Sequence, residues 1–230
     1  FVVWVCDADF VTDIENLPIN STTWNNYINR SLTNHFRVAT NLYAKGARTL
    51  IMPNAVDLTM VPSYYGNENR TFIRQKIADF NTGLATTVVN QIKARCPGIT
   101  VYVPDFFALF DSMLANPATY GLVNPNPGHD AIFDGYTSLS SGLGVSYVFW
   151  DDTDPTAKAQ AVMADVVQRM VSPATIRNVV SLGTSNRLDV VNVPVGLSGY
   201  VEGRTNVVSG SWTSATNFNS TSVSQAIYVP

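Results

Sequence analysis

Residues 80–104, FNTGLATTVVNQIKARCPGITVYVP, run directly from a helical pattern into a buried strand. The helical pattern extends from about Thr71 to Arg95 and repeats apolar side chains every three or four positions, at Ile73, Ile77, Phe80, Leu84, Val88 and Ile92. This spacing places one apolar stripe along a helix. The following run, ITVYVP (99–104), is short, apolar and rich in β-branched residues, which favours a strand buried on both faces. A helix leading into such a strand indicates an α/β fold.

The same alternation occurs elsewhere in the first 171 residues. FVVWV (1–5), TLIMP (49–53) and YVFWD (147–151) are further short apolar runs that predict strands. A helical repeat from Thr22 to Gly46 carries Trp24, Ile28, Leu32, Phe36 and Ala39. Buried strands that alternate with amphipathic helices predict a parallel sheet covered by helices. We predict that Trp4 and Trp150 lie in the core of this fold and that His35 lies on the surface of a helix.

The pattern changes after Pro173. Apolar and polar residues alternate, and turn residues recur about every 8 to 12 positions, which is typical of short antiparallel strands. We therefore predict two domains, an α/β domain over 1–171 and a small β module over 172–230. Trp212 lies in the module, where it is expected either in the core or as a platform for a sugar.

Composition excludes some classes of function. Only 13% of the residues are charged and the net charge is −3, so nothing in the chain favours nucleic acid as a partner. No run of 18 apolar residues predicts a membrane span. The start, FVVWV, lacks the features of a signal peptide. Cys6 and Cys96 are expected as two separate buried thiols, although a single disulfide is an alternative.

Carboxylates follow the predicted strands. Asp7 and Asp9 come after the first, and Asp151 and Asp154 come at and after the last. Because ligands bind at the carboxyl ends of parallel strands, these four side chains are expected near one site. Hard oxygen ligands of this kind suit Ca²⁺ or Mg²⁺, but no complete calcium-loop spacing is present, so no cofactor or metal is assigned.

Four stretches resemble consecutive blocks of the GDSL-type (SGNH) hydrolases. FVVWVCDADF (1–10) is similar to a block that usually reads VVWVGANDF, and YVFWDDTDPTAKAQAVMADVVQ (147–168) is similar to the last block, YxFWDxxHPTxxxH. Residues 46–64 and 80–114 resemble the blocks between them. The resemblance implies a three-layer parallel-sheet fold whose N-terminal strands would precede Phe1, so that the chain is a fragment.

The resemblance also assigns residues to catalytic positions. Asp151 matches the acid that orients the catalytic histidine, but Asp154 stands at the histidine position. Cys6, Ala8 and Asp9 match the Gly, Asn and Asp of the oxyanion block. The Gly-Asp-Ser block that carries the nucleophile has no match in these residues. The most similar stretch, VVSLGTSN (179–186) with Ser185, would require a circular permutation, and it is expected instead to open the β module as a strand and turn.

Asp154 has two interpretations. In Asp-Pro-Thr-Ala it fits the N-cap of a helix with proline at the first position, which contributes about 1 kcal/mol. Alternatively, it keeps a residual catalytic or binding role. The chain has two histidines, and His129, in NPGHDAI, is the one outside the predicted helices. It is expected in a solvated turn, or else as a replacement base from a loop over the cleft.

The resemblance implies an extracellular acyl hydrolase that acts on ester or lipid-like substrates. The replaced residues favour an alternative, a non-catalytic secreted protein built on a hydrolase scaffold. A third interpretation is a hydrolase that uses a cation held by the acidic cluster. The C-terminal segment, through GSWTSATNF (210–218), resembles small β modules of secreted environmental bacterial proteins, which implies a bacterial source and a carbohydrate or cell-surface partner.

Overall fold

The stretch at 80–104 folds into a helix followed by a strand, as predicted. Helix α4 (Arg70–Gly83) continues through one π-helical segment, η2 (Leu84–Val88), into α5 (Val89–Arg95), and β2 spans Thr100–Tyr102. All six apolar residues of the predicted stripe are buried. Periodicity therefore located both the helix and its inward face.

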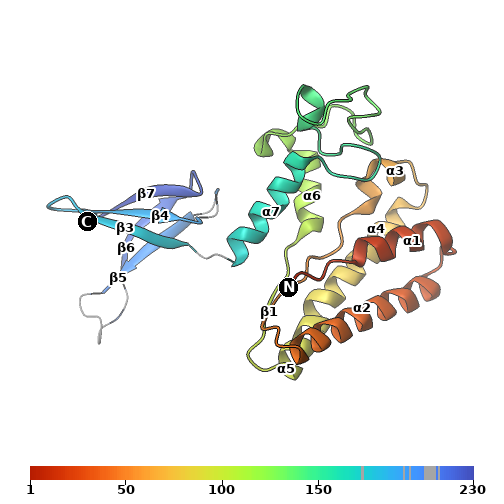
Figure 1. Ribbon diagram of the computed structural model, residues 1–230, viewed down its shortest axis with the longest axis horizontal. Helices are drawn as coiled ribbons and strands as arrows, with labels where there is room; N and C mark the ends of the chain where they lie inside the picture. The colour runs from red at the N-terminus through yellow and green to blue at the C-terminus, as the bar shows by residue number, and fades with distance from the viewer. Residues whose placement is uncertain (172–173, 194, 197, 205–210, 212) are drawn as a thin grey trace. The chain divides into compact units, whose positions relative to one another are not determined.

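The computed structural model describes every residue except 172–173, 194, 197, 205–210 and 212. The chain divides into two compact units, Phe1–Val167 and Gln168–Pro230. Figure 1 shows the helices of the first unit and the strands of the second. In the part of the chain that is described, no helix has both the length and the apolar character needed to cross a membrane.

Parallel pairing organises the strands of the first unit. β1 (Thr49–Ile51) pairs with β2 in parallel, with Leu50 opposite Val101, and Val2 forms a parallel bridge to Ile51. The predicted α/β class is confirmed at this level, whereas the three-layer arrangement stays a prediction. The predicted strand at 1–5 is wrong beyond that one bridge, because helix α1 (Cys6–Asn16) begins immediately afterwards. Asp7 and Asp9 in the first turn of α1 favour the helix by complementing its dipole.

Helix α2 (Ser21–Ala44) packs against α1, α4 and α5 (Figure 1). The Asn20 side chain caps it by accepting a hydrogen bond from the Thr23 amide at 2.9 Å. Phe10, Trp24 and Phe80 meet as an aromatic cluster between these helices. His35 is 1% exposed and contacts the Phe80 ring, so the predicted surface position is wrong. The long α2 presents His35 to α4, together with Trp24 and Ile28, because all three lie on its buried face.

Further elements follow in the first unit, and the last of them, α7 (Ala157–Val171), extends four residues into the second. They are η1 (Leu58–Met60), α3 (Pro62–Tyr65), α6 (Phe106–Ala115), η3 (Pro117–Tyr120), η4 (Leu143–Ser146) and α7. The predicted strand at 147–151 is absent, since Tyr147 and Phe149 form only isolated bridges, to Val123 and Pro155. Trp4 is 38% exposed, so its predicted place in the core is also wrong. Cys6 and Cys96 are separate buried thiols.

The cap of α7 is Thr156, and the predicted cap at Asp154 is wrong. The Ala159 amide donates to the Thr156 hydroxyl at 3.2 Å, and the same hydroxyl donates to the Tyr147 carbonyl at 2.7 Å. The helix begins at Ala157, three residues after Asp154, which is too late for the Asp154 carboxylate to serve its first amides.

Replacing Thr156 by alanine is expected to lower the free energy of unfolding by about 1–2 kcal/mol, because a cap and a buried hydrogen bond are lost together. Asp154→Ala serves as the control and should change it by less than about 0.5 kcal/mol. Urea denaturation of both variants measures this. If Asp154→Ala lowered the free energy of unfolding as much as Thr156→Ala or more, Asp154 would be the cap of α7.

Among its described residues, the second unit forms five strands. They are β3 (Thr175–Ser181), β4 (Asn186–Val191), β5 (Ser198–Gly203), β6 (Thr213–Asn219) and β7 (Ser224–Val229). Two antiparallel sheets form, ordered β3-β4-β7 and β5-β6, over a small core of Leu188, Val190, Val193 and Ile227. Ser185 lies in the β3–β4 turn. Trp212 lies outside the described residues, and the assignment of 1–171 to a hydrolase-like domain and of 172–230 to a β module stays a prediction.

Candidate functional site

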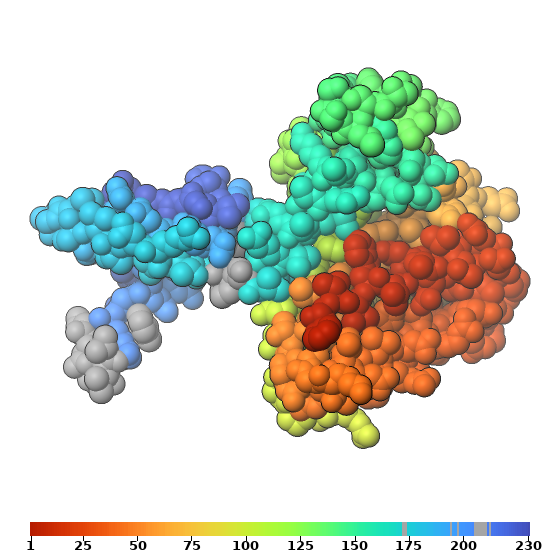
Figure 2. Space-filling model, viewed as in Figure 1, coloured from red at the N-terminus to blue at the C-terminus, as the bar shows by residue number. Residues whose placement is uncertain are grey.

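A cavity of about 230 Å³ lies in the first unit, between the start of the chain, the segment 56–64 and the residues before α7. Most of its lining is apolar, including Val11, Val56, Leu58, Val61, Phe110 and Phe149. Trp4 also lines it, with its ring edge-to-face against Phe106 at 5.0 Å. Figure 2 shows the N-terminal residues, in red, on the surface of this unit.

Ala8 and Asp154 line the same cavity. α1 places Ala8 there, and the turn that precedes α7 places Asp154 there. These are the two positions that the resemblance assigns to the oxyanion asparagine and the catalytic histidine. The structure therefore brings them together, although neither carries the family's side chain.

Asp7 is the group that the sequence did not single out from its acidic neighbours. It lines the cavity, and its Oδ1 accepts a hydrogen bond from the Val56 amide at 2.9 Å. Burial raises the pKa of Asp7 to about 7, and the bonds from Val56 and the Trp4 side chain offset this only in part. No sequence pattern reveals this, because the residues that bury Asp7 come from distant segments.

Asp151 holds its own turn. Its Oδ1 accepts hydrogen bonds from the amides of Thr153, at 3.0 Å, and Asp154, at 2.7 Å. It does not line the cavity, and it contacts Asp154 through the backbone amide. Its observed role is to fix the turn that carries Asp154 to the cavity.

Cys6 and Asp9 lie away from the cavity. The Cys6 thiol is buried 3.8 Å from the Pro53 carbonyl, and burial raises its pKa well above the ordinary value. Asp9 accepts a hydrogen bond from the Ser31 hydroxyl at 2.5 Å. Of the four acids expected near one site, only Asp7 and Asp154 share this cavity. Across the described residues, no three His, Cys, Asp or Glu side chains gather as a metal ion would require.

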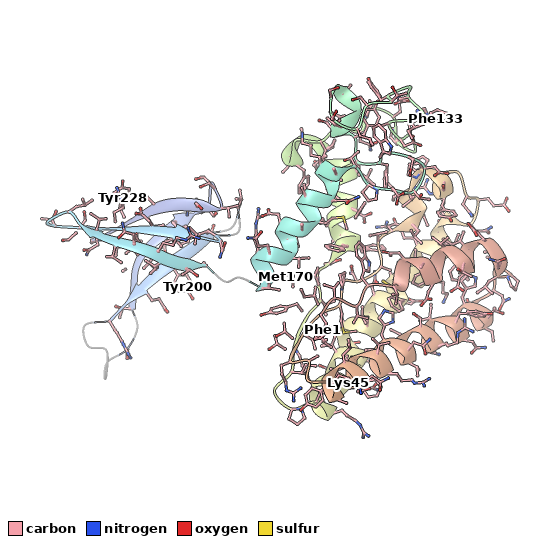
Figure 3. The ribbon with its side chains drawn as sticks, in the orientation of Figure 1. Phe1, Lys45, Phe133, Met170, Tyr200 and Tyr228 are labelled. Carbon is pink, nitrogen blue, oxygen red and sulfur yellow. The ribbon has the colours of Figure 1, made fainter. Side chains whose placement is uncertain are left out.

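His129 does not reach the cavity either. Its Nδ1 lies 2.8 Å from the Asp134 carboxylate, which also accepts a bond from the Tyr147 hydroxyl at 2.8 Å. The His129 ring packs on Phe133 at 4.3 Å, and Figure 3 shows Phe133 at the outer edge of its loop. The two bonds hold the pKa of Asp134 below its usual range. This pairing fixes His129 in its own loop.

The chemistry available in the cavity is limited. The methyl group of Ala8 donates no hydrogen bond to an oxyanion, and Asp154 is a carboxylate where a serine triad needs an imidazole. Tyr64 stays protonated at neutral pH, since burial and its bond to Glu15 raise its pKa to about 12. Asp7 is the one lining group whose raised pKa suits proton transfer near neutral pH.

The comparisons with known proteins agree on one group of relatives. The chain is 26% identical over 153 residues to the GDSL esterase/lipase At1g71250 of Arabidopsis thaliana, and 30% identical over 137 residues to GDSL esterase/lipase 7 of the same plant. It is 27% identical over 175 residues to a third, the GDSL esterase/lipase At5g03810. These matches cover 60%, 54% and 69% of this chain, respectively. No protein-family model matches the chain.

The chain is therefore a distant relative of the GDSL esterases and lipases. It spans 40%, 37% and 49% of the length of these three relatives, so their activity is not assigned to this chain. All three are plant proteins and lend no support to the bacterial source implied above.

Proposed function

We propose that the unit Phe1–Val167 binds a neutral ester or a similar small apolar ligand, on a scaffold that descends from GDSL ester hydrolases and has lost ordinary serine-triad turnover. One observation carries this proposal: Ala8 and Asp154, at the positions of the oxyanion asparagine and the catalytic histidine, line one mainly apolar cavity.

The walls of the cavity favour binding. Its volume of about 230 Å³ suits a short acyl or alkyl chain, and each buried methylene contributes about 0.8 kcal/mol. Asp7 and Asp154 add two acidic side chains to this lining. At neutral pH a protonated Asp7 can donate a hydrogen bond to an ester carbonyl, which a fully ionised carboxylate cannot do.

The replaced side chains argue against turnover. General-base catalysis contributes about 10²–10⁴ to a rate, and one oxyanion donor contributes about 10²–10³. Losing both removes roughly four to seven orders of magnitude if the effects are independent.

Titration of the 230-residue protein with propyl butyrate, followed by tryptophan fluorescence and by acid release, tests the proposal. We expect saturable quenching that is lost in Trp4→Phe, because Trp4 lines the cavity, and no release of acid above the uncatalysed rate. Unchanged fluorescence in the wild type, or acid release that Asp151→Ala abolishes, would refute it.

Charge in the cavity predicts a pH dependence for carboxylate ligands. Butyrate should bind more weakly than its ester, because it meets Asp7 and Asp154. As pH falls through about 7, Asp7 gains a proton and repulsion decreases, so butyrate affinity should rise. Between pH 8 and pH 6 the rise should reach about tenfold, and Asp7→Asn should abolish it. A pH-independent affinity in the wild type would contradict this assignment.

A hydrolytic alternative is favoured by the position of Asp7 in the lining of the cavity, where burial raises its pKa to about 7. In this alternative Asp7 is the general base and the nucleophile is supplied by residues outside this chain. Fluorophosphonate labelling of the protein from its native source, followed by peptide mapping, discriminates the two functions. A stoichiometric serine adduct that Asp7→Asn slows would support hydrolysis, whereas no adduct would support binding alone.

We propose in addition that the chain belongs to an extracellular protein and that Gln168–Pro230 is an interaction module for carbohydrate or a cell surface. Support comes from exposed aromatic side chains, Tyr200 and Tyr228, which are 63% and 59% exposed and could stack on sugar rings. Sedimentation of the protein with insoluble polysaccharides tests this. Equal sedimentation of the wild type and of Tyr200→Ala/Tyr228→Ala would oppose it.

A further inference from the structure

A second pocket, also of about 230 Å³, lies between α1 and α2. Every residue that lines it has a polar side chain: Asp9, Thr12 and Asp13 from α1, and Tyr27, Arg30, Ser31 and Asn34 from α2. Within each helix these residues recur three or four positions apart, so they share one face. The ester cavity uses other α1 residues, Asp7, Ala8 and Val11, and the two sites are therefore separate.

Asp13 lines this pocket from a buried position. The residue is only 6% exposed, and among the described residues no side chain or backbone amide donates a hydrogen bond to its carboxylate. A carboxylate that receives no donor from the protein depends on water or a ligand in the pocket for its hydrogen bonds. A ligand that donates hydrogen bonds would satisfy Asp13 without any change in the fold.

The charges around Asp13 give the sign of that ligand. Burial raises the pKa of Asp13 to about 6, Asp9 on α1 adds to this rise, and Arg30 on α2 opposes it. Arg30 also stacks on the Tyr27 ring, with 4.2 Å from Cζ to the ring centroid. The lining thus carries two carboxylates, Asp9 and Asp13, against one guanidinium, Arg30, and this excess of negative charge attracts a cation.

We infer that this pocket binds a small protonated primary amine. Its acceptors are the carboxylates of Asp9 and Asp13, with oxygen atoms of Tyr27 and Asn34 in the same lining. An ammonium group carries three N–H donors and matches several such acceptors at once. A divalent metal fits less well, because the lining offers two carboxylates beside a guanidinium and more space than a bare ion fills.

Calorimetric titration with ethanolammonium chloride tests the inference, with tetramethylammonium chloride and calcium chloride as comparison probes. Ethanolammonium should bind, and tetramethylammonium, which has no N–H donor, should bind at least about tenfold more weakly. Stronger binding of calcium than of ethanolammonium would overturn the assignment to an amine.

Three variants complete the test. Asp13→Asn should weaken ethanolammonium binding by about tenfold or more, and Arg30→Gln should strengthen it, because a competing positive charge is removed. Glu68→Gln removes an exposed acid outside this lining and should change nothing. Asp13→Asn should also fold, since it removes a buried charge. Should its circular dichroism differ from that of the wild type, Asp9→Asn replaces it, with the same expected direction. The inference would be overturned if Asp13→Asn, or Asp9→Asn in its place, bound ethanolammonium as tightly as the wild type. Weaker binding of ethanolammonium by Arg30→Gln would overturn it as well.

The pH dependence adds an independent check. Binding requires the charged form of Asp13, so affinity should fall about tenfold between pH 7 and pH 5 in the wild type. Affinity that is constant over this range would contradict the role of Asp13. None of these outcomes depends on the ester cavity.

Discussion

Replacing Arg74 by alanine is expected to lower the free energy of unfolding by about 3 kcal/mol, near the lower end of the cost of breaking a buried ion pair. Arg74 pairs with Asp57, whose side chain is fully buried. It also pairs with Asp111, through Nη2 to Oδ2 at 2.5 Å. Without Arg74, the Asp57 carboxylate would keep its bonds from Thr59 but lose its only cation among the described residues. The Arg74 side chain is 42% exposed, so in the variant water can take its place beside Asp57, which limits the loss of stability.

Urea denaturation measures this effect, and two controls separate charge from packing. Asp111→Ala, at the more exposed end of the network, should cost less than about 1 kcal/mol. Asp57→Asn in the Arg74→Ala background should recover part of the loss, because the unpaired charge is removed. A loss below about 1 kcal/mol for Arg74→Ala would show that Asp57 does not depend on its partner.

This pair also supports the ester cavity. Asp57 caps η1 by accepting hydrogen bonds from the amide of Thr59, at 3.1 Å, and from its hydroxyl, at 2.7 Å. The neighbouring residues Val56, Leu58 and Val61 form one wall of the cavity. A folded Arg74→Ala protein should therefore bind the ester more weakly as well as unfold more easily.

Replacing Ala8 by phenylalanine is expected to reduce ester affinity by about a hundredfold or more. Ala8 lies in α1 at the edge of the cavity, and a phenyl ring there would occupy much of its volume of about 230 Å³. Losing three or four buried methylene contacts of the ligand corresponds to that factor. Because Ala8 is exposed, the stability of the protein should change by less than about 1 kcal/mol.

Ala8→Ser is the matched control, since it keeps the cavity open at the same position. It should bind the ester within about threefold of the wild type. Tryptophan fluorescence compares the three proteins, and thermal unfolding checks their stability. Equal affinity in Ala8→Phe and Ala8→Ser would place the ester elsewhere on the protein.

Periodicity predicted the long elements of the fold well. The stripe from Ile73 to Ile92 and the strand at 99–104 were located because burial on one side leaves a regular pattern. Short elements carry weaker signals. FVVWV is apolar enough for a strand, but the acidic first turn of α1 begins at Cys6 and ends the extended segment early. Likewise, Asp154 and Thr156 both fit a cap, and only the observed start of α7 separates them.

The candidate site was predictable in part. Resemblance to the GDSL blocks identified Ala8 and Asp154, which the structure brings to one cavity. It did not reveal the buried state of Asp7 or Asp13, because each depends on the packing of segments far apart in the chain. His35 was misplaced for the same reason: its helix repeat contains polar neighbours, yet the contact with Phe80 buries it.

An NMR experiment with propyl butyrate follows the binding and the hydrolysis of a neutral ester at the same time. Saturation transfer reports contact between the protein and the alkyl protons of propyl butyrate, and the same spectra report how much ester remains. We expect transfer that disappears in Ala8→Phe and persists in Ala8→Ser, while the ester stays intact. Loss of the ester at a rate that Asp151→Ala abolishes, or transfer that is unchanged in Ala8→Phe, would contradict the proposed function.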